Sequence, residues 1–263
     1  MPRAFWKGVI SFGMVAIPVK MYKATETKEI SFNMLHKTCM TRTRQVPFCP
    51  TDNEYISRKD TVRGYEFTKG RYVVLSDEDF EKIPLRTAHA IGIMRFVEEK
   101  QIDRSYYYGS HYLEPEELGA KPFRLLKEAL EKTGLVGIAK VALQRREHLC
   151  SVRPLGDIMA LDTIHYQSEI VPATQIAPPK PDVSEPELDM AVNLIKVMAG
   201  SFQPELYKDE YQSALKEMVE AKIKGEKLVV PEAPKIEIGD LMASLRASIE
   251  AAKREPVAAR ARR

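Results

Sequence analysis

Residues 2–20 read PRAFWKGVISFGMVAIPVK, a stretch rich in β-branched and other apolar residues. Val9, Ile17 and Val19 are of the types that favour strands, so we expect strand structure here. Gly8 and Gly13 lie inside this short region, and two glycines in a strand region indicate bends or bulges. A closed or strongly curved sheet requires such bends, so this stretch predicts one.

Further strand patterns follow between residues 71 and 166. Runs of β-branched and apolar residues occupy 71–75, 89–97, 135–143, 148–153 and 158–166. Ser76, followed by acidic residues, predicts a helix start. Apolar residues at helical spacing predict a second helix over 120–133, which ends before Gly134. Many strands with few helices predict a β-rich α+β fold with a curved sheet or barrel.

The character of the chain changes at a group of five prolines between residues 171 and 186. Proline fixes φ and removes a backbone donor, so this group predicts a boundary. Three helices are expected beyond it: one begins at Ser184, with Glu187 completing a capping box, one covers about 204–224, and one starts at Asp240. We expect a core over residues 1–180, a helical C-terminal arm over 181–235, and a helix with a basic, partly disordered tail over 236–263.

The charge of the 263-residue chain is segregated along the sequence, although the net charge is only +3. Residues 1–75 carry +7, 76–119 carry −5, 120–160 carry +4, 161–250 carry −7 and 251–263 carry +4. Such segregation lets a nearly neutral molecule present a basic face. The composition is that of an ordinary globular protein, which excludes collagen-like and largely disordered classes.

Basic residues gather in two places where phosphate contacts are plausible. Lys37, Arg42 and Arg44 lie close together, near Lys59 and Arg63, and a second group surrounds the turn at 145–146. Arginine and lysine on loops suit phosphates, which supply affinity without reading sequence. Few aromatic residues are interleaved with them, which disfavours a platform that stacks single-stranded bases.

No catalytic signature is present in the sequence. A P-loop, a dinucleotide glycine fingerprint and a nucleophile elbow are all missing, and the five histidines have no H-E-x-x-H pattern. We therefore expect no enzymatic activity and no cofactor. The three cysteines do not make a disulfide framework, and no apolar run approaches the roughly 20 residues that span a bilayer. These features predict a cytoplasmic protein that does not bind membranes.

One possible metal site involves His36, Cys39, Cys49 and Asp52. Asp52 stands where the second cysteine of a Cys-x-x-Cys knuckle would be, and a single carboxylate is an unusual fourth ligand for structural zinc. The alternatives are structural zinc or plain thiols, and we favour plain thiols and expect no metal.

The order of several short motifs resembles that of the bacterial Ku proteins. The resemblance begins with residues 2–13 and 17–20 and continues through 35–44, 62–66 and 72–75. It extends through 102–103, 112–115, 125–130 and 149–154, and then through 209–211, 220–222 and Gly225. No single motif is decisive, but their order and spacing are specific, and they cover the chain to about residue 230.

The resemblance implies a Ku-type β-barrel core, a loop arch that completes a ring, and a C-terminal arm that embraces a second copy. The implied function is sequence-independent binding of double-stranded DNA ends by a homodimer, in double-strand break repair by non-homologous end joining. The implied partners are DNA ends, a second copy and a multi-domain ATP-dependent DNA ligase, and the implied location is the bacterial nucleoid.

On this basis we predict which basic residues contact DNA. The expected channel residues are Lys37, Arg42, Arg44, Lys59, Arg63, Arg145 and Arg146. The tail is expected to add non-specific affinity through Lys253, Arg254, Arg260, Arg262 and Arg263. Two alternatives stay open: a metal-dependent nuclease or hydrolase that uses His36, Cys39 and Asp52, and a monomeric RNA-binding barrel.

Overall fold

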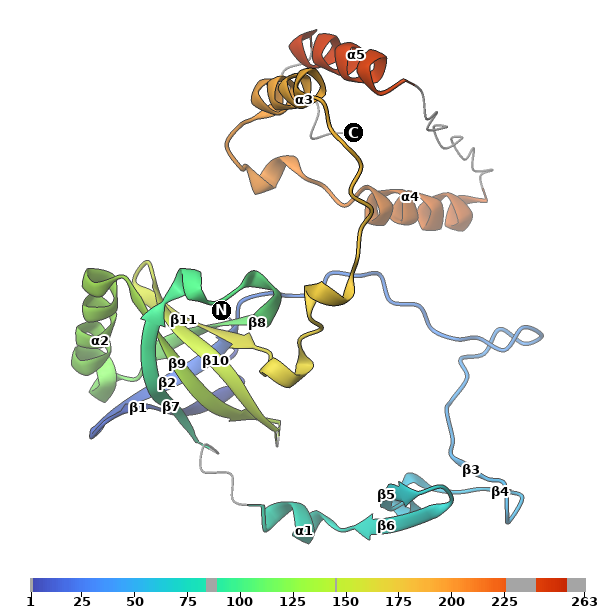
Figure 1. The fold of residues 1–263 in the computed structure, drawn as a ribbon. Coiled ribbons are helices and arrows are strands. Elements are labelled where there is room, and N and C mark those ends of the chain that lie inside the picture. Colours follow the sequence, from blue (N-terminus) through green and yellow to red (C-terminus); the bar gives the residue numbers. More distant parts are fainter. Residues whose placement is uncertain (1, 84–88, 145, 226–239, 255–263) are drawn as a thin grey trace. The chain divides into compact units, whose positions relative to one another are not determined.

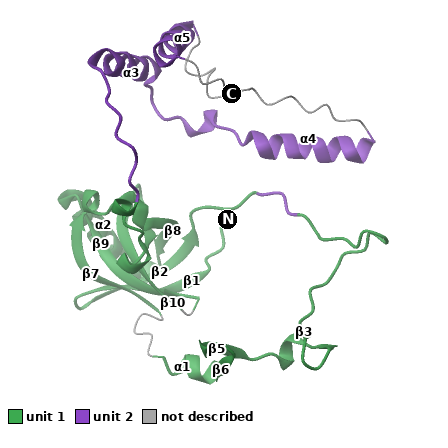
Figure 2. Ribbon diagram, turned by 45° about the vertical axis from the view of Figure 1, so that its right-hand side comes forward, with its two compact units in different colours: residues 1–28, 32–175 green, residues 29–31, 176–263 purple. Residues whose placement is uncertain are grey.

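A computed structural model of the chain describes residues 2–83, 89–144, 146–225 and 240–254. It divides the chain into two units, which Figure 2 shows in different colours. The first unit holds residues 1–28 and 32–175, and the second holds 29–31 and 176–263. The division after Gln175 falls within the proline-rich segment.

Seven strands of the first unit form a closed barrel in the order β1-β2-β8-β11-β10-β9-β7 (Figure 1). All neighbouring pairs are antiparallel except β1 and β7, which pair in parallel from Val9 opposite Ala90 to Ser11 opposite Gly92. The predicted barrel is therefore confirmed. The strands are β1 (Trp6–Phe12), β2 (Val15–Lys23), β7 (Ala90–Glu98), β8 (Tyr107–Pro115), β9 (Leu135–Leu143), β10 (Arg146–Leu155) and β11 (Ile158–Ile164).

The barrel interior is filled by apolar side chains that alternate along the strands. In β2 the fully buried residues are Ile17, Val19 and Met21, one on every second position, as expected where one face of a strand is buried. The 14-residue helix α2 (Ala120–Thr133) packs three buried side chains onto the same core. Those three are Phe123, Leu126 and Leu130. A single core thus holds the strands and α2 together.

Residues 24–89 leave the barrel after β2 and return at β7, and we call them the excursion. They carry two small two-stranded sheets, the short helix α1 (Asp77–Glu81) and a 3-10 helix at Arg58–Asp60. The sheets pair β3 (Phe48–Cys49) with β4 (Glu54–Tyr55) and β5 (Arg63–Thr68) with β6 (Arg71–Leu75). Among the described residues of the excursion none is buried, so it has no hydrophobic core of its own.

The described part of the second unit holds the α-helices α3 (Glu185–Met198), α4 (Glu210–Lys224) and α5 (Leu241–Arg254). Helix α5 packs against α3, and its Ile249 and Ala252 are buried. The described residues of α4 are all exposed or half-buried. No helix in the described ranges has the length and apolar character needed to cross a membrane.

Most sequence-based expectations agree with these elements, although some differ. The capping boxes at Ser76 and Ser184 are both present. Strand β8 was not expected, because its aromatic and polar residues give no clean alternation. Helix α4 begins at Glu210 and not near Pro204, since Asp209 caps it and Pro204 belongs to a separate 3-10 turn.

Gly119 supplies a specific test of how α2 is held on the barrel. A Cβ atom added at Gly119 would lie 2.6 Å from the carbonyl oxygen of Pro18, a backbone atom of β2. We expect Gly119→Ala to destabilise the barrel by about 1–3 kcal/mol through overpacking. The measurement is urea unfolding followed by the fluorescence of Trp6, the single tryptophan of the chain.

Gly92→Ala is the matched control, because the nearest atom to its added Cβ is the Ser11 hydroxyl oxygen at 3.9 Å. This control should leave the urea midpoint nearly unchanged. If the urea midpoint of Gly119→Ala equals that of the wild type, α2 can move away from β2 without cost. The short distance between Gly119 and Pro18 would then not be a packing constraint.

Candidate nucleic-acid interface

A small irregular hairpin near residues 34–43 carries two of the predicted DNA contacts. Leu35 and Arg42 form an isolated antiparallel bridge across it. The turn closes where the backbone N–H of Met40 donates to the carbonyl of His36 at 2.7 Å, and Met40 has a positive φ of 54°. Lys37 lies within this turn and is exposed, as is Arg42. Local backbone bonds therefore present both cations to solvent.

Lys59 and Arg63 lie in a second part of the excursion and differ in their surroundings. Lys59 is in a 3-10 helix capped by Ser57, whose hydroxyl oxygen accepts the backbone N–H of Lys59 at 3.3 Å. Arg63 begins β5, and its Nη1 donates to Oδ1 of Asp77 at 3.3 Å. Its guanidinium also lies 5.1 Å from the centre of the Phe80 ring. Arg63 is thus held in place, whereas among the described residues no carboxylate pairs with the ammonium of Lys59.

The predicted contacts fall into two groups by ion pairing. Arg63 and Arg146 each form an ion pair with a carboxylate. Within the described part of the chain, the other four are exposed and have no carboxylate partner; they are Lys37, Arg42, Arg44 and Lys59. We call these four the unpaired cations. All of them lie in the excursion.

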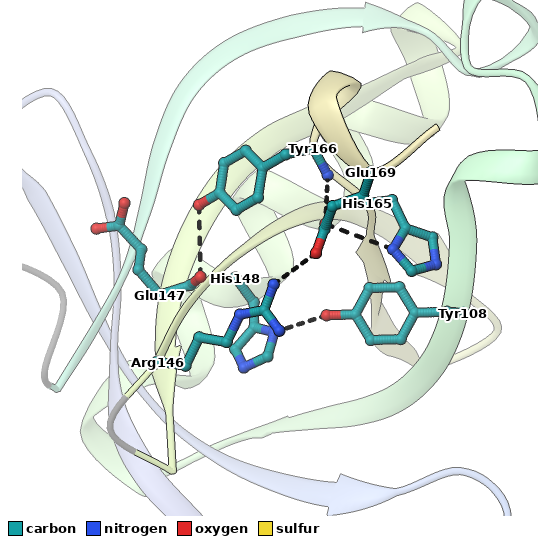
Figure 3. Close-up of polar contacts among 7 residues, drawn as sticks. All are labelled: Tyr108, Arg146, Glu147, His148, His165, Tyr166 and Glu169. Carbon is teal, nitrogen blue, oxygen red and sulfur yellow. Dashed lines mark hydrogen bonds and ion pairs between the residues drawn. The ribbon is translucent and has the colours of Figure 1, made fainter. Parts of the chain in front are cut away.

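Arg146 belongs to a cluster of polar side chains at the start of β10 (Figure 3). Its Nη2 donates to Oε1 of Glu169 at 2.6 Å. The other oxygen of Glu169 accepts the backbone N–H of Tyr166 at 2.9 Å and lies 3.4 Å from Nδ1 of His165. The Tyr166 N–H and then the Arg146 guanidinium hold the pKa of the Glu169 carboxyl below its ordinary value. Glu169 is therefore ionised at neutral pH and compensates Arg146.

Tyr108 and His148 extend the same cluster toward β8 (Figure 3). The Tyr108 hydroxyl and Nδ1 of His148 are 2.6 Å apart, and the Tyr108 ring lies 4.5 Å from the ring of His165. Burial lowers the pKa of His148, so this imidazole is neutral near pH 7. These contacts fasten the segment after β11 to the barrel wall.

Two further basic residues of the barrel are also compensated. Nζ of Lys140 lies 2.7 Å from Glu147, and Nε of Arg153 lies 2.7 Å from Asp162, whose side chain is only 9% exposed. The net charge of +4 summed over residues 120–160 leaves out Asp162 and Glu169, because both lie beyond residue 160. The predicted positive character of this part of the barrel is therefore weaker in the folded protein than along the chain.

Several predicted residues are not tested by the structure. Arg145 lies outside the described residues, and so do Arg260, Arg262 and Arg263 of the tail. Lys253 and Arg254 lie in the last turn of α5, and Arg254 is 3.9 Å from Glu250. The part of the tail that the structure describes is therefore helical.

The four side chains of the possible metal site form two separate pairs. Nδ1 of His36 lies 3.1 Å from the Cys39 sulfur, and the Cys49 thiol donates to Asp52 at 2.9 Å. Over the described ranges, no three histidine, cysteine or acidic side chains are grouped so that they could hold a metal ion. The four residues, as placed, do not fit a zinc site or the metal centre of the alternative nuclease.

The thiols themselves differ strongly in character. Cys39 is exposed, and hydrogen bonds from the side chain and backbone of Thr41 and from His36 lower the pKa of its thiol to about 7. Cys150 is buried in the barrel core, and burial raises the pKa of that thiol. Cys39 therefore has substantial thiolate character at neutral pH.

Comparison with known proteins places these features in a family. A family model described as "Ku70/Ku80 beta-barrel domain" matches residues 11–190, which include the excursion and nearly all of the barrel. The chain belongs to the Ku family. The match also includes the four unpaired cations and the cluster around Arg146.

Curated relatives extend the similarity to most of this Ku chain. It is 43% identical over 263 residues to a protein of Symbiobacterium thermophilum, 40% over 254 residues to one of Frankia casuarinae, and 39% over 253 residues to one of Archaeoglobus fulgidus. Each is named non-homologous end joining protein Ku. The alignments cover 97%, 95% and 95% of the chain, and they span 65%, 64% and 100% of the respective relatives.

Thiol alkylation tests the arrangement around Cys39 in this Ku chain. Because its pKa is about 7, the rate of reaction with iodoacetamide should rise with pH and reach half its maximum near pH 7. In His36→Ala, which removes the imidazole beside Cys39, the half-maximal rate should be reached at a higher pH. The measurement is the rate of mass increase at Cys39 across pH 5–10 at constant ionic strength.

Cys150 is the internal control and should stay unmodified in the folded protein, because it is buried. A Cys39 midpoint near the ordinary thiol value of about 8.5 would contradict the assigned environment.

Proposed function

We propose that this chain binds the ends of double-stranded DNA without regard to sequence, as part of double-strand break repair by non-homologous end joining. The observation that carries the proposal is the set of four unpaired cations on exposed loops of the excursion, in a Ku-family chain. An exposed cation without a carboxylate partner can exchange its counterion for a phosphate, which is the sequence-independent part of DNA affinity. The curated relatives' shared name supports the repair context.

We infer further that two copies of the chain form a ring around the duplex. Two-stranded sheets are marginal alone, and β5–β6 exposes Tyr65, Tyr72 and Val74. The helices of the second unit also expose apolar residues, which are Leu188, Ile195, Met198, Tyr211 and Ile223. Apolar faces of this kind are covered in obligate homodimers. The Ku resemblance implies that a second copy of the chain covers these apolar faces.

The remaining partner in this proposal is a multi-domain ATP-dependent DNA ligase. End joining needs a step that seals the strands, and the chain shows no catalytic motif with which to do so. We infer that the protein acts by binding and recruitment and not by catalysis. This part of the proposal follows from the family resemblance and names no contact surface.

Charge reversal of two unpaired cations tests the assignment of the DNA contacts. We expect Arg42→Glu with Arg44→Glu to weaken binding to a linear duplex. The magnitude of the slope of log affinity against log salt concentration, which we call the salt slope, should fall by about 0.9 for each lost phosphate contact. The measurement is the dissociation constant for a fluorescent duplex at several salt concentrations.

The matched control reverses two exposed lysines of α2, Lys121→Glu with Lys132→Glu, which changes the net charge by the same amount. The control should keep the wild-type slope. If both double variants show the same slope as the wild type, residues 42 and 44 do not contact DNA.

A topological experiment tests the ring. Protein is bound to a linear duplex of plasmid length, the DNA is circularised with an added ligase, and the complex is challenged with high salt and competitor DNA. A ring should stay trapped on the closed circle, and it should not bind a circle that was closed beforehand.

Linearising the trapped complex with a restriction enzyme should then release the protein. Equal binding to linear and pre-closed duplexes, with no trapping, would contradict the ring and favour a surface binder such as a monomeric RNA-binding barrel.

A further inference from the structure

The ion pair between Arg146 and Glu169 is more exposed than the pair that Arg153 and Asp162 form on the same barrel. The side chains of Arg146 and Glu169 are 60% and 33% exposed, whereas those of Arg153 and Asp162 are 29% and 9% exposed. Asp162 is also held by the Ser110 hydroxyl at 2.5 Å. The Arg153 pair is therefore built into the barrel wall, while the Arg146 pair meets solvent.

Among the described residues, Arg146 is engaged through one nitrogen, Nη2. Nη2 donates to Glu169, and the described residues provide no second partner for the guanidinium (Figure 3). An arginine can bind a phosphate through two parallel N–H groups, so Arg146 keeps donors for one. Exposed ion pairs are weak, which means that a phosphate can compete with Glu169 for this guanidinium.

Glu169 is well placed to control that competition, because its other contacts do not depend on Arg146. Its second oxygen accepts the Tyr166 N–H and faces His165, so the carboxylate stays in position when the arginine moves. The fixed negative charge then has two effects: it cancels the charge of Arg146, and it repels a phosphate that approaches.

We propose that Glu169 is a positioning residue that limits the affinity of this protein for DNA by holding Arg146 as a masked phosphate contact. The inference rests on the proposed DNA binding. Arg146 then contributes to DNA affinity only to the extent that Glu169 releases it. The four unpaired cations, in contrast, need no such release.

Glu169→Gln in the full chain tests the proposal, because it removes the charge and keeps the size of the side chain. We expect linear duplex to bind roughly fivefold more tightly, and the salt slope to rise by about 0.9, as one phosphate contact is gained. Arg146→Gln alone should weaken binding modestly, because it leaves the Glu169 charge uncompensated, and should not raise the salt slope. The double variant should lose the gain of Glu169→Gln, since the gain acts through Arg146.

Glu187→Gln is the matched control for the lost negative charge. Glu187 also accepts a backbone N–H at the start of a helix, from Ser184 at 2.8 Å, and no described arginine or lysine pairs with it. This control should keep the wild-type affinity and slope. Thermal unfolding by Trp6 fluorescence verifies that each variant is folded.

The possible outcomes separate the inference from the function on which it rests. Loss of affinity in Glu169→Gln, or an unchanged slope, would overturn the masked contact and leave Glu169 with a structural role only. A gain that persists without Arg146 would also overturn it. Failure of the wild type to bind linear duplex would refute the proposed function instead.

Discussion

The parallel pairing of β1 with β7 is the contact on which the arrangement of the chain depends. It closes the barrel, because β1 already pairs with β2 on its other edge. It also ties both ends of the excursion to one strand, since residues 24–89 leave after β2 and return at β7. The entropy of closing a loop rises only slowly with its length, so a long excursion without a core is compatible with a stable barrel.

The barrel and the excursion differ in how far their predicted DNA contacts are ion-paired. On the barrel, strand pairing brings basic residues beside acidic ones, and Lys140, Arg146 and Arg153 are all compensated. In the excursion, Arg63 pairs with Asp77, whereas the other four predicted contacts are exposed and have no carboxylate partner among the described residues. For the proposed DNA binding, the four unpaired cations of the excursion are therefore the first candidates for phosphate contact.

Much of the fold was predictable because it depends on local patterns. Alternating burial in β2, the helical spacing in α2 and the capping boxes at Ser76 and Ser184 are all properties of short segments. Strand β8 was missed because its burial comes from pairing with β2 and β11 and not from its own alternation. The start of α4 was misplaced because Asp209, and not the earlier proline, caps it.

The sequence by itself determined that the chain is a β-rich barrel with a helical C-terminal part, and which basic residues were candidates for DNA contact. Only the tertiary structure decided which of the described candidates lack a carboxylate partner. The physical reason is that an ion pair depends on distance in space: Glu169 lies 23 residues from Arg146 in the chain, yet their charged atoms are 2.6 Å apart. Charge summed along a sequence cannot register that pairing, whereas the closed barrel fixes it.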